Sequence, residues 1–120
     1  MQRLSSSYVI AVCRRAWSCR LPNSSTRAVL AFALFAAVQL ADAVLTQRGI
    51  ERFGLAAEAN PLIGFTMRSF GITTALASWK LFAVLAGAVL HVSERHLALA
   101  ILTLFAVFAA AVPWAWILAV

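Results

Sequence analysis

Three long apolar stretches constrain this sequence more than any other feature. They cover about residues 28–46, 70–92 and 97–118, and at about 1.5 Å per residue each can cross a hydrocarbon layer of about 30 Å as a helix. Backbone groups in lipid must be paired within a helix or a closed barrel, and no alternation of period two indicates a barrel. The sequence therefore predicts an all-α membrane protein with three transmembrane helices.

The composition excludes a soluble fold. Hydrophobic residues make up 63% of the 120 residues and charged residues 12%, whereas soluble domains carry about 25% charged residues. So small a body cannot hide that much apolar surface from water. The net charge of +6 comes largely from arginines near the amino terminus, a pattern that indicates orientation in a lipid bilayer and no nucleic-acid binding.

A basic leader over residues 1–27 precedes a transmembrane domain over residues 28–120. The leader has five arginines and no acid, so we expect it to be disordered or to lie on the cytoplasmic membrane surface. Its Cys13 and Cys19 are then reduced thiols. Two alternatives stay open: an organellar transit peptide, and a signal peptide cleaved at the Ala-Asp-Ala sequence of residues 41–43, which would remove the first span.

Lysines and arginines near the span ends set the expected orientation. With a cytoplasmic amino terminus, the five leader arginines and Arg95 lie inside, and three arginines lie outside, at positions 48, 52 and 68. The positive-inside rule then predicts a multi-pass protein of the cell membrane, such as a bacterial inner membrane. Its amino terminus is cytoplasmic and its carboxyl terminus extracytoplasmic.

The connector between the first two spans carries a helix-start signal. Asn60 can cap a first helical turn, and Pro61 at the first helical position lacks an N–H that would stay unbonded. We predict a short interfacial helix over residues 61–70, ended by Gly71. Glu58 either bonds the first amides of this helix or is a titratable group at the mouth of a site in the membrane.

Asp42 and Lys80 lie within apolar spans, where either charge costs about 2.5 to 3.5 kcal/mol to insert. The two spans are antiparallel, and the axial offset of about 7.5 Å is one that a lysine stem largely covers. We therefore expect the two residues to pair. Gln39 and Thr46 share the helical face of Asp42. The candidates for a polar seam are Gln39, Asp42, Thr46, Glu58, Asn60 and Lys80.

The remaining spans offer weaker signals. On the second span we expect Thr73, Ala77 and Gly87 to share the face of Lys80 and to permit close helix approach. Pro113 predicts a kink in the third span, with Trp114 and Trp116 at the headgroup boundary. The turn at residues 91–96 contains two histidines and a glutamate, which we interpret as polar loop residues and not as metal ligands.

The order and spacing of the polar residues resemble a known family. Asp42-x-x-x-Thr46, then Glu58-x-Asn60-Pro61, then Lys80 in an apolar helix are similar to the pattern of small prokaryotic membrane proteins known as domain of unknown function 5658. The resemblance covers about residue 30 to the third span. It implies a compact multi-helix membrane domain with these six residues as its signature, and it brings no established activity.

Three classes of function stay open. The favoured one is a non-enzymatic membrane protein, structural or partner-binding, whose polar seam holds the helices and whose surfaces bind a second copy or a membrane protein partner. The second is an oligomeric proton or small-solute conduit that uses Asp42, Lys80 and Glu58. The third is a membrane-embedded enzyme, which the lack of HExxH, GxSxG and phosphate-binding glycine loops disfavours. We predict no catalytic residue, metal ligand or cofactor.

Overall fold

The computed structural model describes residues 24–120, and this part of the chain is helical with short turns and no strand. The elements in order are α2 (Ser24–Phe53), the 3₁₀ turn η1 (Leu55–Ala57), α3 (Pro61–Phe70), α4 (Ile72–Val92), α5 (His96–Ala106), the π-helical turn η2 (Val107–Ala111) and α6 (Val112–Ala119). Helix α2, helix α4 and the continuous α5–α6 segment are each long and apolar enough to cross a membrane. The predicted all-α fold, including the short helix between the first two spans, is confirmed.

Helix α2 is longer than the first span predicted from the sequence. It begins at Ser24, inside the expected leader, and continues through Phe53. The polar residues after Thr46 include strong helix formers, and Gln47 donates a hydrogen bond to Glu51 one turn later at 2.8 Å. The rest of the leader, with its cysteines, lies outside the described residues.

Two glycines end the helices on either side of the connector. Gly54 and Gly71 have φ values of 84° and 88°, a backbone region that side chains other than hydrogen disfavour. Gly54 stops α2, and Gly71 separates α3 from α4. The chain can therefore leave α2, form the short helix α3 and begin α4 within the eighteen residues 54–71.

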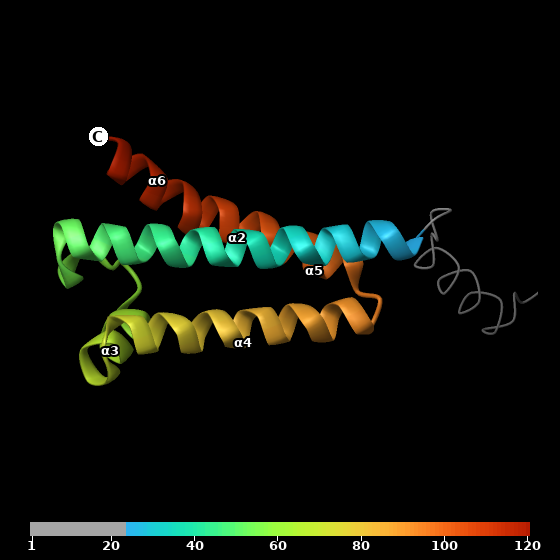
Figure 1. Cartoon of the computed structure of the whole chain (residues 1–120), viewed down its shortest axis with the longest axis horizontal. Helices are drawn as coiled ribbons and strands as arrows, with labels where there is room; N and C mark the ends of the chain where they lie inside the picture. The colour runs from blue at the N-terminus through green and yellow to red at the C-terminus, as the bar shows by residue number, and fades with distance from the viewer. Residues whose placement is uncertain (1–23) are drawn as a thin grey trace, which may run out of the picture.

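Helix α2 lies between the other two long segments (Figure 1). Helix α4 runs antiparallel along one side of α2, and the α5–α6 segment packs along α2 from another side and diverges from it toward the carboxyl terminus. A buried apolar cluster joins α2, α3, α4 and α6 at the end where α3 lies; it consists of Ile50, Met67, Ala75, Leu76 and Trp114. This cluster holds together the end of the molecule where α2 stops and α4 starts.

Pro113 distorts the third segment as its position predicts. Proline lacks an N–H and its ring collides with the carbonyl four residues earlier. The helix responds with the π-helical turn η2 directly before it, in which the N–H of Val112 donates to the carbonyl of Val107. Trp116 is exposed, but Trp114 is only 8% exposed. The burial of Trp114 was not predicted, and it arises because the ring packs against Gly49 of α2.

Candidate polar site between α2 and α4

Four of the six candidate polar residues come together between α2 and α4. Gln39, Asp42 and Thr46 are 5%, 3% and 4% exposed on one face of α2, because spacings of three and four residues return to the same side of a helix. Lys80 reaches them from α4. We refer to these four residues as the polar seam.

The ammonium group of Lys80 is the centre of the seam. Its Nζ forms an ion pair with Oδ2 of Asp42 and donates to Oε1 of Gln39 at 3.3 Å. The hydroxyl of Thr46 donates to the other carboxylate oxygen of Asp42, also at 3.3 Å. Both carboxylate oxygens and the glutamine oxygen therefore accept a hydrogen bond from within the seam.

Burial makes this pairing necessary. The Asp42 side chain is 5% exposed and that of Lys80 is 23% exposed, so neither charge is well solvated. An unpaired charge in such surroundings costs several kcal/mol, which an ion pair with further hydrogen bonds offsets. Among the described residues, the one buried side-chain nitrogen or oxygen without a partner is Nδ1 of His91, outside the seam.

A second close contact fixes α2 against α4 at a matching position. A Cβ atom on Gly87 would lie 2.2 Å from the ring of Phe35, and Phe35 is fully buried. Phe35 precedes Asp42 by seven residues, and Gly87 follows Lys80 by seven residues. Because α2 and α4 are antiparallel, the aromatic contact and the ion pair are separated by the same two helical turns on both helices.

Glu58 and Asn60 form a separate hydrogen-bonded unit at the start of α3. The side-chain oxygen of Asn60 accepts from the amides of Leu62 and Ile63 at 3.0 and 3.4 Å, and the Glu58 carboxylate accepts from the amide of Asn60 at 2.8 Å. With Pro61 at the first helical position, the Glu-x-Asn-Pro sequence is a helix cap. Glu58 thus bonds the amide of the cap residue Asn60, and the first helical amides that it was expected to bond are taken by Asn60.

The expected face of α4 is packed over part of its length. Lys80 and Gly87 face α2, whereas Thr73, seven residues before Lys80 on the same face, is not covered. Ala77 is also exposed, whereas Ala75 and Leu76 are buried. Helix α3 packs beside the start of α4, where the indole of Trp79 donates to the hydroxyl of Thr66 at 3.0 Å. The sequence predicted the face of α4 that meets α2, but α4 is apolar around most of its circumference and carried no signal for the side that α3 would cover.

Two further contacts were not predicted. The ring of Trp114 on α6 covers Gly49, where a Cβ atom would lie 2.1 Å from it, and Arg52 donates to the carbonyl of Leu118 at 3.1 Å. A glycine in one helix and an aromatic residue in another are the only sequence signal for such a contact. Within residues 24–120, no group of three histidine, cysteine, aspartate or glutamate side chains could hold a metal ion.

The fold and the seam together define a small multi-pass α-helical membrane protein with an ion pair between two of its helices. The chain belongs to the family described as "Domain of unknown function (DUF5658)", whose profile matches residues 33–120. That range contains the whole seam and the Glu-x-Asn-Pro cap. No curated protein and no solved structure matches the chain.

Proposed function

We propose that this chain is a non-enzymatic membrane protein whose polar seam fixes the position of α2 against α4 and whose apolar outer faces bind a second copy or another membrane protein. The observation that carries the proposal is that the seam bonds to itself. Both carboxylate oxygens of Asp42 and Oε1 of Gln39 accept hydrogen bonds from Lys80 or Thr46. A group that serves transport or catalysis needs a free position for its substrate, whereas a structural pin does not.

The spacing of the two contacts between α2 and α4 supports a structural role for the seam. Sliding α4 by one residue along α2 would turn its contact face by about 100°. The ammonium of Lys80 would leave Asp42, and the ring of Phe35 would meet a side chain in place of Gly87. One helix register therefore satisfies both contacts, which is the best-supported use of a buried polar group in a helix pair.

The amino-terminal side of the seam is closed by apolar packing. Phe35 lies one turn before Gln39, is fully buried and fills the space over Gly87. A proton or solute conduit through the seam would need polar groups or water past this ring. The packing therefore favours the structural role over the conduit.

The partner-binding part of the proposal comes from the outer faces. Large apolar side chains on α4, such as Leu81, Phe82, Leu85 and Val89, are 56–66% exposed. In a bilayer these faces meet lipid or another helix. We place the protein in a cell membrane with a cytoplasmic amino terminus and an extracytoplasmic carboxyl terminus, on the arginine distribution alone.

Proton flux into liposomes tests the role of the seam. Vesicles that contain the purified chain should take up protons no faster than lipid-only vesicles after a potassium-driven potential is applied. Asp42→Asn should leave this background unchanged, as should Glu94→Gln, a matched loss of one acid at an exposed turn. Flux in the parent chain that Asp42→Asn abolishes and Glu94→Gln does not would identify a conduit.

Mass analysis of the chain purified in mild detergent tests the partner-binding part. We expect a second copy or a stoichiometric membrane protein in the particle. A monomer that carries only a small molecule would contradict this part of the proposal and leave the seam result unaffected.

A further inference from the structure

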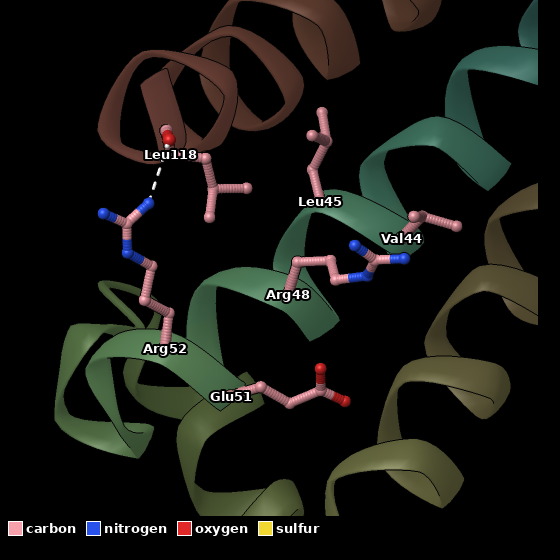
Figure 2. Close-up of a pocket in the computed structure, with 6 residues that line it drawn as sticks. All are labelled: Val44, Leu45, Arg48, Glu51, Arg52 and Leu118. Atoms are coloured by element: carbon pink, nitrogen blue, oxygen red, sulfur yellow. Dashed lines mark hydrogen bonds between the residues drawn. The ribbon is translucent and has the colours of Figure 1, made fainter. Parts of the chain in front are cut away.

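A groove lies between the end of α2 and the end of α6, outside the polar seam (Figure 2). It has a volume of about 630 Å³. Its lining residues are Val44, Leu45, Arg48, Glu51, Arg52 and Leu118. The apolar members come first along α2 and the charged members follow in the next two turns, so the groove has an apolar part and a charged part.

The charged part is basic and its arginines have no acidic partner. Arg48 and Arg52 are four residues apart and project from the same face of α2. The lining also holds one acid, Glu51, which accepts a hydrogen bond from Gln47 and keeps its charge, so the formal charge of the lining is +1. Within residues 24–120 the one ion pair is that of the seam. Arg52 uses one N–H on the carbonyl of Leu118, which leaves most of its five donors free.

The groove lies at the depth of lipid headgroups. The span predicted from the sequence ends at Thr46, so the backbones of Arg48 and Arg52 lie about 3 and 9 Å beyond it. The headgroup layer on each side of a bilayer is about 5 to 7 Å thick, so the backbone of Arg48 lies within it. The backbone of Arg52 lies just outside it, and the long side chain can reach back into it. Trp116, which precedes Leu118 by two residues, is 73% exposed, as is typical of tryptophans at the membrane interface.

We propose that this groove binds the phosphate of an anionic phospholipid, with part of an acyl chain on Val44, Leu45 and Leu118. Guanidinium groups match phosphate oxygens with paired hydrogen bonds. An anionic lipid places its negative phosphate and its apolar chain in the same order as the two parts of the groove. A zwitterionic lipid adds a cation that Arg48 and Arg52 repel, so the groove favours a headgroup with net negative charge.

Native mass spectrometry of the full chain in detergent tests this proposal. The probes are phosphatidylglycerol and phosphatidylcholine with identical acyl chains. We expect phosphatidylglycerol to bind about tenfold more tightly, because both lipids offer the phosphate but phosphatidylcholine also brings a cation that the arginines repel. Arg48→Gln should lower this preference about tenfold. Arg68→Gln, a matched loss of an exposed arginine on α3, should change it less than twofold.

Arg48→Gln is the variant of choice because it removes no hydrogen bond between helices. Arg52→Gln would also remove the bond to the carbonyl of Leu118. Equal binding of the two lipids by the parent chain would refute the proposal. So would an equal loss of preference in Arg48→Gln and Arg68→Gln, which would mean diffuse surface charge. Displacement of the lipid by glycerol phosphate at comparable concentration would show that the acyl chain contributes nothing, and would also overturn it.

Discussion

The ion pair between Asp42 and Lys80 predicts a specific pattern in a double-mutant cycle. The changes are Asp42→Asn, Lys80→Met and both together. Each keeps the approximate size of the side chain and removes its charge. Breaking a buried pair from one side leaves the other charge without compensation, so each single change should destabilise the chain more than half of the double change does.

The surroundings of the two charges set the magnitudes. Removing one member of a buried pair costs about 3 to 5 kcal/mol. Asp42→Asn leaves an ammonium that is 23% exposed and retains Gln39 as an acceptor, so its cost should lie at about 3 kcal/mol or below. Lys80→Met leaves a carboxylate that is 5% exposed and retains only the hydroxyl of Thr46. That change should cost about 4 to 5 kcal/mol, and the coupling between the two should be about 2 to 3 kcal/mol.

The assay is reversible unfolding of the detergent-solubilised chain by sodium dodecyl sulfate, followed by circular dichroism. Glu94→Gln combined with Lys80→Met serves as the control cycle, because Glu94 is exposed at the far end of α4. The control should be additive within about 0.5 kcal/mol. Additivity in the Asp42 and Lys80 cycle as well would refute the reasoning, and a larger cost for Asp42→Asn than for Lys80→Met would refute its electrostatic part.

Three further predictions concern packing, capping and topology. Gly87→Ala should destabilise the chain by about 1 to 3 kcal/mol, because the added methyl group collides with the ring of Phe35. In the same unfolding assay Gly64→Ala, where a Cβ atom meets nothing closer than 3.8 Å, should stabilise the chain by up to about 1 kcal/mol. Asn60→Ala should cost about 1 kcal/mol and Asn60→Asp much less, since aspartate retains the cap; equal costs would rule out the cap. A reporter fused after Val120 should be extracytoplasmic, and a cytoplasmic signal would reverse the proposed orientation.

The sequence predicts those parts of the fold for which any alternative would cost much free energy. Long apolar stretches must become helices in lipid, and Asp42 and Lys80 must find partners because no solvent is available to them. Asn60 and Pro61 combine a side chain and a backbone that suit one position, the start of a helix. In each case the residue has one low-energy environment, and that environment can be predicted from the local sequence.

The parts that could not be predicted depend on relations between distant residues. The extension of α2 through Phe53 was not predicted, because nothing in the sequence showed that the polar residues after the span would continue its helix. The packing of Trp114 on Gly49 and of Phe35 on Gly87 depends on how each helix is rotated, and spans that are apolar on nearly all sides do not encode a rotation. The burial of Ala75 and Leu76 on α4 was not predicted either.

The contacts of α2 explain how so open an arrangement holds one structure. Lipid is as apolar as a neighbouring helix, so apolar area by itself does not select one helix arrangement over another. Helix α2 meets each of the other long segments through a glycine–aromatic contact and through polar bonds. Toward α4 these are Gly87 with Phe35 and the bonds of Lys80 to Asp42 and Gln39. Toward α6 they are Gly49 with Trp114 and the bond from Arg52 to Leu118. The shape contact sets the distance between two helices and the polar contact sets their register, so α2 orders the chain although most of its apolar surface is left for lipid.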